Sequence, residues 1–325
     1  MDIAVSPYHL TTREPAALAA MLLADRVVTM LPAPLEGQEW GAIRSAAERV
    51  PRYLEFMQSW QWTMPLWTEG VIVSGLEGQE AVGELRAVCE RIDRSEHLAP
   101  LRAIMKADLF EDHERYLDAV ARDLLKAGPD PGITVPVAAG LDMFAMRHGA
   151  MVARSDPSSV VQKAEAELGA QAFAAALPVF LQASAERILD ARELLEPQLQ
   201  ELRIAFDRVS AASLDNPEPG ELRAILAAPG KAYAEAFESQ RELLFVSDPD
   251  DDVRPVEGTV MLTGMVLPPD CVLESSLKAM RTLGVRAPAP SDTNGKNLLG
   301  GKIGKPLKVM SLYVRVLGRP AATRR

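Results

Sequence analysis

The sequence predicts a mainly helical protein that ends in a small α+β lobe. Hydrophobic residues make up 48% of the 325 residues but aromatic residues only 5%, so the core depends on Ala, Leu, Val and Met. Alanine has the highest helix propensity, and small side chains allow helices to pack closely. Helical spacing of apolar residues recurs through the first three quarters of the chain, whereas strand-like segments gather in the last quarter. We therefore expect an acidic helical domain over residues 1–242 and an α+β lobe over 243–325.

The first elements are predicted from capping and β-branched residues. Thr11 or Thr12 can cap a helix in which Pro15 occupies the first turn, where the missing N–H is tolerated. Residues 26–31 are β-branched and stop at a Pro-Ala-Pro segment, which is typical of a short strand. Residues 70–75 form a second candidate strand.

The middle of the chain is predicted as helices separated by proline-rich breaks. Residues 38–126 keep a helical pattern, and the Gly-Pro-Asp-Pro-Gly segment at 128–132 ends it. A further helix carries Leu141, Phe144, Ala145 and His148.

The longest predicted helical segment covers residues 156–213. Pro178 and Pro197 are expected to kink or divide it, because proline removes a helical hydrogen bond. Around and after Pro197, the apolar residues keep the spacing of one helix face: Leu195, Leu199, Leu202, Phe206 and Val209.

The predicted C-terminal lobe contains three strands and one helix. Residues 243–246 and 259–267 are strand-like, and Asp270 can cap an amphipathic helix that ends at Gly284. A Pro/Gly-rich linker over 286–306 leads to residues 307–317. That last strand has apolar residues on both faces, which predicts a central place in the sheet.

Charge is distributed unevenly between the two predicted domains. The segment from Lys278 to Arg325 carries eleven Lys or Arg and one acid, a net +10, within a chain whose net charge is −10. The remaining residues therefore carry −20. Opposite potentials of this size predict docking on protein, either a partner or another copy of the chain, and we rank nucleic acid behind it because Tyr313 is the only aromatic residue in the basic segment.

The basic segment also contains a Gly/Lys-rich stretch at 295–305 that resembles a phosphate-binding loop but does not match the spacing and residue types of that motif. Five residues instead of four separate the glycine from Gly301-Lys302, and Ile303 replaces the Ser or Thr that holds Mg²⁺. We interpret the stretch as a basic loop. The candidate partner-binding residues are Lys296, Lys302, Lys305 and Lys308.

Two histidines provide the alternative hypothesis of an enzyme or small-ligand-binding protein. His113 and His148 lie on predicted apolar helix faces near carboxylates such as Asp142, and facing helices can join such groups into a polar site. Neither histidine belongs to a metal-binding motif, so a hydrogen-bonded core histidine is the competing interpretation.

No metal or cofactor is predicted. Asp248, Asp250 and Asp252 alternate as in a calcium loop, but Val253 and Thr259 replace the glycine and the bidentate glutamate that such a loop needs. The four tryptophans gather within 28 positions and are interpreted as core residues, with a binding surface as the alternative: Trp40, Trp60, Trp62 and Trp67.

The sequence-based hypothesis is a soluble, non-enzymatic binding or assembly protein that contacts a protein partner or another copy through its basic C-terminal lobe. No apolar run approaches 18 residues, because Asp142 and Gln182 interrupt the best candidates, so no membrane contact is expected. Cys89 and Cys271 lie far apart without a pairing pattern, which indicates reduced thiols and a cytoplasmic location.

Overall fold

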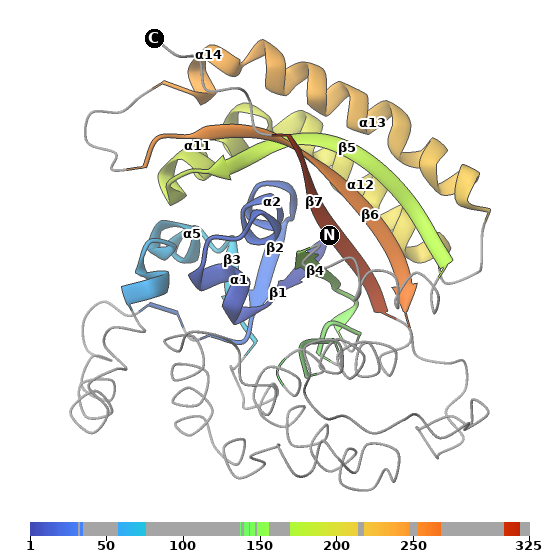
Figure 1. Ribbon diagram of the computed structural model, residues 1–325, viewed down its shortest axis with the longest axis horizontal. Helices are drawn as coiled ribbons and strands as arrows, with labels where there is room; N and C mark the ends of the chain where they lie inside the picture. The colour runs from blue at the N-terminus through green and yellow to red at the C-terminus, as the bar shows by residue number, and fades with distance from the viewer. Residues whose placement is uncertain are drawn as a thin grey trace, which may run out of the picture.

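The computed structural model shows a curved seven-stranded sheet with helices on its faces (Figure 1). It describes residues 1–31, 33–34, 58–75, 137, 140–142, 144–146, 148–155, 170–213, 218–246, 253–267 and 309–318. Of these residues 52% are helical and 29% are in strands, so the fold is α/β. The prediction of a mainly α protein with a small α+β lobe is wrong.

The sheet is mixed, with the strand order β3-β2-β1-β4-β7-β6-β5. Five strands run parallel: β1 (Asp2–Val5), β2 (Arg26–Thr29), β3 (Ile72–Ser74), β4 (Met151–Ser155) and β7 (Val309–Gly318). The long strands β6 (Val256–Leu267) and β5 (Ala170–Gln182) add an antiparallel portion beyond β7. The strand predicted at 307–317 is therefore central, as expected, since β7 pairs with β4 and β6.

The helical prediction failed mainly at β5. This segment is rich in alanine and was assigned to the long helix at 156–213, but it pairs with β6 over its whole length. Pro178, predicted to kink a helix, instead lies within a strand at the edge of the sheet, where a missing N–H is tolerated. Tertiary pairing thus overrides the helix propensity of alanine here.

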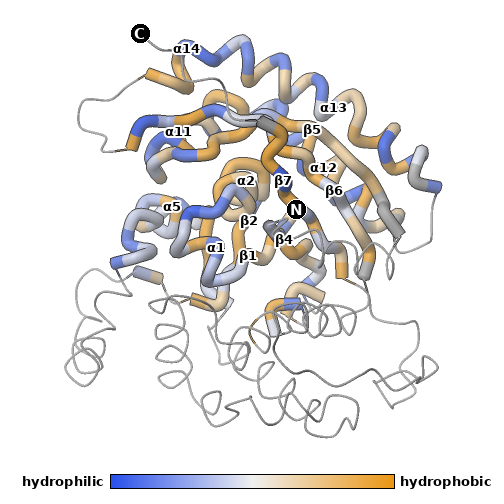
Figure 2. Tube along the Cα trace, viewed as in Figure 1, coloured by the Kyte–Doolittle hydropathy of each residue, from blue (hydrophilic) through white to orange (hydrophobic). Residues whose placement is uncertain are grey.

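Helix α2 (Pro15–Leu23) is the centre of the core. It follows the short helix α1 (Pro7–Thr11), and all its residues from Ala16 to Leu23 are buried. Figure 2 shows α2 as hydrophobic, as expected for a helix enclosed on all sides. The structure confirms the helix start at Pro15 but places Glu14 at the N-cap, because Thr11 and Thr12 belong to the end of α1.

The face of the sheet that carries α2 is also covered by the helices that follow β5. These are α11 (Ala185–Leu194), α12 (Glu196–Ser213), α13 (Pro219–Ser239) and α14 (Arg241–Leu244). Phe173 of β5 packs on Phe206 of α12 with ring centroids 5.7 Å apart. The Tyr233 hydroxyl of α13 donates to the Pro178 carbonyl at 2.8 Å, and α13 runs along the outside of β5 (Figure 1).

Several sequence predictions about these helices are confirmed, and one is wrong. Residues 185–213 are helical, and their apolar stripe is buried at Leu195, Leu199, Leu202, Phe206 and Val209. The strand predicted at 243–246 overlaps helix α14 instead, whose carbonyl end is capped by Arg187.

The opposite face of the sheet is covered by helical residues between 137 and 148. Phe144 lies directly over Gly75, where an added Cβ would be 3.0 Å from the phenylalanine ring. This contact explains why glycine follows β3. The helix predicted around Leu141, Phe144 and Ala145 is confirmed, and all three residues are buried.

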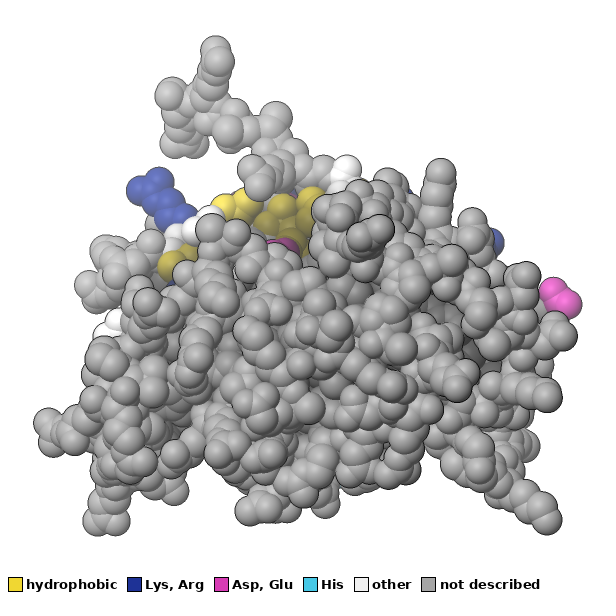
Figure 3. Space-filling model, turned by 60° about the horizontal axis from the view of Figure 1, so that its bottom comes forward, with side chains coloured by type: hydrophobic (Ala, Val, Ile, Leu, Met, Phe, Trp, Pro, Cys, Tyr) yellow, Lys and Arg dark blue, Asp and Glu magenta, His cyan; other side chains and the backbone are white. Residues whose placement is uncertain are grey.

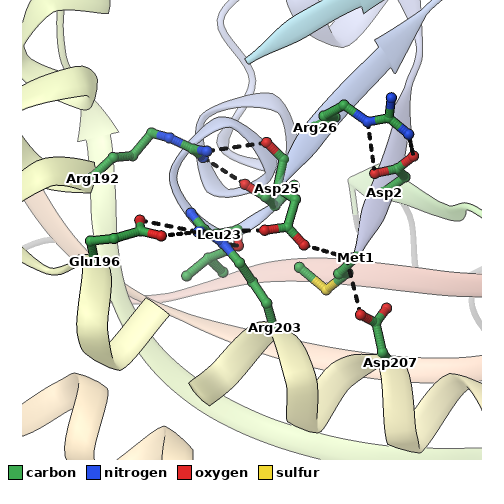
Figure 4. Close-up of polar contacts among 10 residues, drawn as sticks. Met1, Asp2, Leu23, Asp25, Arg26, Arg192, Glu196, Arg203 and Asp207 are labelled. Atoms are coloured by element: carbon green, nitrogen blue, oxygen red, sulfur yellow. Dashed lines mark hydrogen bonds and ion pairs between the residues drawn. The ribbon is translucent and has the colours of Figure 1, made fainter. Parts of the chain in front are cut away.

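Two arginines fasten α2 to the α11–α12 corner (Figure 4). Arg192 donates to the carbonyls of Met21, Leu22, Ala24 and Asp25 at the end of α2. Arg203 donates to the Leu23 carbonyl at 2.9 Å and to the Glu196 carboxylate at 3.1 Å. These contacts satisfy carbonyls that a helix end leaves without partners.

A few large apolar side chains of the described residues are exposed. Val316 and Leu317, at the end of β7, are 36% and 50% exposed. From the side shown in Figure 3, hydrophobic side chains of described residues surface as a small patch. Within the described ranges, no helix has the length and apolar character needed to cross a membrane.

The predicted domain boundary at 242/243 remains a prediction. Strands β6 and β7 lie beyond that boundary, and β7 hydrogen-bonds to β4 from before it.

Candidate functional site

The sheet has a topological switch point between β1 and β4. The chain runs from β1 to β2 and β3 on one side, then returns to place β4 on the other side of β1. In open α/β sheets, ligands bind outside the carboxyl ends of the strands at such a point. The candidate site therefore comprises residues at and just after the ends of β1, β4 and β7.

A buried ion pair lies on one face of the sheet at this position. Arg154 of β4 contacts the carboxylate of Asp142, whose side chain is fully buried, and donates from Nε to Ser311 Oγ of β7 at 3.0 Å. Arg154 is level with Tyr313 in the parallel pairing, so Ser311, two residues earlier, shares its face. Sheet register and the covering helix together hold the guanidinium in place.

His9 lies close to this pair, in the helix α1 that follows β1. Burial, with a smaller contribution from the positive charge of Arg154, lowers the pKa of His9 to about 4. The imidazole is therefore neutral at pH 7. Its Nδ1 atom is buried and has no hydrogen-bond partner among the described residues.

The pKa of Asp142 is shifted in the opposite direction to that of His9. Burial raises its pKa to about 6, against the opposing attraction of Arg154. One carboxylate oxygen contacts Arg154, whereas Oδ2 has no partner within the described part of the chain. Removing a carboxylate from water disfavours its charged form, which is the physical cause of the raised pKa.

Further buried polar atoms lie at the same edge of the sheet. They are the hydroxyl groups of Thr29, the last residue of β2, of Ser155, the last residue of β4, and of Tyr313 in β7, which is paired with Arg154. Within the described ranges none of the three has a hydrogen-bond partner. Buried polar atoms are nearly always satisfied in folded proteins, so these three side chains are candidates to take part in a polar site at this edge.

A pocket of about 320 Å³ opens at the same edge, on the face that carries α2. Its walls come from the α1–α2 turn and from the ends of β5 and β7: Thr12, Arg13, Glu14, Pro15, Leu181 and Val316. The turn is tied to the polar cluster, because the Glu14 amide donates to the His9 carbonyl at 2.9 Å.

Arg13 has an unusual backbone conformation. Its φ of 53° lies in the left-handed region, where no other described residue except glycine is found. Such strain is typical of functional turns. The Arg13 guanidinium carbon lies 4.5 Å from the centroid of the Trp62 ring, a cation–π contact that fixes the side chain.

The residues predicted from the sequence are only partly brought together. Asp142 is in the cluster, but its partner is Arg154. His148 is exposed and stacks on Phe144 with centroids 4.3 Å apart, so it does not lie on a buried apolar face. His113 and the four lysines Lys296, Lys302, Lys305 and Lys308 lie outside the described residues.

Of the tryptophans, Trp60 is fully buried, which confirms its core role. Trp62 and Trp67 are partly buried against the core, and Trp40 lies outside the described residues.

Sequence reasoning missed His9, Arg13 and Arg154. The four-residue strand β1 is too short to show a period, so the residues after it could not be recognised as a strand end. The only signal was the pattern of an apolar run followed by Ser6-Pro7 and a capped helix, which is typical of a strand–turn–helix unit.

Among the described residues, no group of three or more His, Cys, Asp or Glu is placed to hold a metal ion. No protein-family model, curated protein or solved structure matches this chain.

Proposed function

We propose that this protein binds a small ligand at the carboxyl edge of its sheet, in the pocket formed by the α1–α2 turn and the end of β7. The observation that carries this proposal is the pocket itself, which opens at the carboxyl ends of β5 and β7 beside the α1–α2 turn and is lined by the strained Arg13. The hydrogen bond from the Glu14 amide to the His9 carbonyl supports it, because it links the turn to the helix that carries His9. This proposal falls within the alternative class predicted from the sequence, but it uses different residues.

The test compares two tryptophan substitutions at neighbouring positions of β7. Val316→Trp fills the pocket, whereas Leu317→Trp points to the other face of the strand and leaves the pocket open. Saturation-transfer NMR with mixtures of amino acids, monosaccharides, nucleosides and dicarboxylates would identify binders. Binding that is kept by wild type and Leu317→Trp but lost in Val316→Trp is the expected result. A complete lack of binders, or binders indifferent to Val316→Trp, would overturn the proposal.

Assembly through the basic C-terminal segment is a second proposal. The observation that favours it is the pair of exposed apolar residues Val316 and Leu317, at the end of a strand that belongs to the +10 segment. We propose a protein partner or a second copy as the occupant, ahead of nucleic acid.

Light scattering at 50 mM and 500 mM salt tests this second proposal. Neutralising Lys296, Lys302, Lys305 and Lys308 to glutamine should abolish a salt-sensitive oligomer. A salt-insensitive monomer in both proteins would contradict self-assembly, and a high 260/280 nm ratio lost with salt would favour nucleic acid instead. We further propose a cytoplasmic location, supported by the widely separated Cys89 and Cys271.

A further inference from the structure

The pocket walls combine two opposite charges with an apolar surface. Arg13 and Glu14 are adjacent in the turn and line one side, while Pro15, Leu181 and Val316 supply apolar atoms. Thr12 adds a hydroxyl group that is held in place by donating to the Tyr8 carbonyl at 2.7 Å. A ligand that matches all of these walls needs a cation, an anion and a short apolar body.

Arg13 is suited to the anionic group. Arg13 lines the pocket, its guanidinium carbon lies 4.5 Å from the centroid of the Trp62 ring, and a guanidinium carries its N–H donors in one rigid plane. A guanidinium has five such donors, so a contact elsewhere does not exhaust them. Planar paired donors match a carboxylate.

Glu14 is suited to the cationic group. It occupies the N-cap position of α2, yet its side chain makes no capping hydrogen bond. Pro15 follows at the first helical position and has no N–H to offer. The carboxylate is therefore not used by its own helix, although the N-cap position usually serves that purpose.

The size of the pocket limits the ligand. At about 320 Å³ it lies at the lower end of the range for small-molecule pockets, roughly 300–1,000 Å³. A nucleotide or an oligosaccharide would extend beyond these walls, whereas a molecule with one short side chain would fit within them.

We propose that the pocket binds a small zwitterion with an aliphatic side chain, the chemical class of a free aliphatic amino acid. Its carboxylate contacts Arg13, its ammonium group contacts Glu14, and its side chain packs on Leu181 and Val316. This inference rests on the ligand-binding function proposed above and specifies the ligand class of the same pocket.

Isothermal titration with L-leucine and two analogues tests the inference on the wild-type chain. 4-Methylpentanoate lacks the ammonium group, and 3-methylbutylamine lacks the carboxylate. Each analogue leaves one charged wall residue without its partner, so we expect each to bind at least about tenfold more weakly than leucine. Analogues that bind as well as leucine, or a lack of leucine binding, would overturn the inference.

Two variants assign the charges to residues. Glu14→Gln should weaken leucine and 3-methylbutylamine but leave 4-methylpentanoate unchanged. Arg13→Asn should do the reverse, and asparagine tolerates the left-handed conformation that this position requires. An equal effect of both variants on both analogues would contradict the assignment.

The outcome separates this inference from the proposed function. If a ligand of another chemical class binds and Val316→Trp abolishes that binding, the ligand-binding function is supported and the zwitterion inference is wrong. If neither leucine nor any compound in the NMR mixtures binds the pocket, both proposals fail together.

Discussion

At the residue scale, His9 and Asp142 respond to burial in opposite ways. Both lie near the Arg154 guanidinium, and burial disfavours the charged form of each. The pKa of His9 falls to about 4, and the pKa of Asp142 rises to about 6. The number of charged groups in the cluster is therefore lowest at mildly acidic pH, where His9 is still neutral, Asp142 is protonated and only Arg154 is charged.

The two shifts predict opposite contributions to the pH dependence of stability. For His9, the unfolded state binds the proton more readily, so its stabilising contribution is present above pH 6.5 and is lost as the pH falls towards 4. For Asp142, the folded state binds the proton more readily, so stability rises as the pH falls from about 6 to 4. Each effect is on the order of 3 kcal/mol at most, and in the wild type they partly cancel.

Single variants should reveal each contribution. Acidification from pH 6.5 to 4 should lower the free energy of unfolding more steeply in Asp142→Asn than in wild type, and less steeply in His9→Gln. Urea unfolding followed by tryptophan fluorescence measures both slopes, with the double variant as the control that removes both groups. Curves of both single variants parallel to wild type would show that the groups do not titrate as proposed.

At the element scale, α2 depends on arginines that are distant in sequence. The Arg192 guanidinium donates to four carbonyls at the end of α2. Burial, together with the nearby positive charge of Arg203, lowers the pKa of Arg192 to about 10. Even with that shift it is charged at pH 7. The helix has no basic residue in its own last turn, so this charge is supplied by α11.

Arg192→Met should therefore destabilise the protein by about 1–3 kcal/mol, because it keeps much of the packing but leaves buried carbonyls without donors. Arg208→Met, at an exposed position of α12, is the control and should change stability by less than about 0.5 kcal/mol. Thermal unfolding of both variants measures the difference. Equal midpoints would mean that water replaces the arginine without loss.

In the antiparallel strands, Gly264 leaves the space that the Phe173 ring occupies. A Cβ at Gly264 of β6 would lie 2.1 Å from the Phe173 ring, so Gly264→Ala should cost about 1–3 kcal/mol. In a Phe173→Leu background the same substitution should cost less, because the clash is relieved. Gly230→Ala, in helix α13 with only an ordinary contact to Leu177, should be neutral or stabilising. Chemical denaturation of the wild type, the three single variants and the Phe173→Leu/Gly264→Ala double variant checks both signs.

These elements show why part of the fold could be predicted from the sequence and part could not. The prediction succeeded where an amphipathic period was long, as in the stripe from Leu195 to Val209, or where β-branched residues were bounded by breaks, as in β2 and β7. It failed at β1 and β4, which are four and five residues long, and at the alanine-rich β5. The site was missed for the same reason, since Arg154 and His9 meet only after β1 and β4 pair.

At the scale of the whole molecule, the basic segment and the acidic chain are joined in one sheet. Strand β7 belongs to the +10 segment, yet Val309, Met310, Leu312, Tyr313 and Val314 are all buried. The segment therefore supplies core and charge together. The charge contrast alone could not distinguish an inserted strand from an appended lobe.

The central place of β7 leads to the last prediction. Truncation after residue 308 removes the strand that bridges β4 and β6, leaving two unpaired edges and an exposed core. We expect cooperative unfolding to disappear and the amides of Ile3–Val5 in β1 to lose protection from hydrogen exchange, although β1 does not pair with β7. Truncation after Gly318 keeps all of β7 and should retain that protection. If β1 stayed protected after the larger truncation, the fold around β1 would not depend on β7, and β7 would be an addition to that unit instead of part of its core.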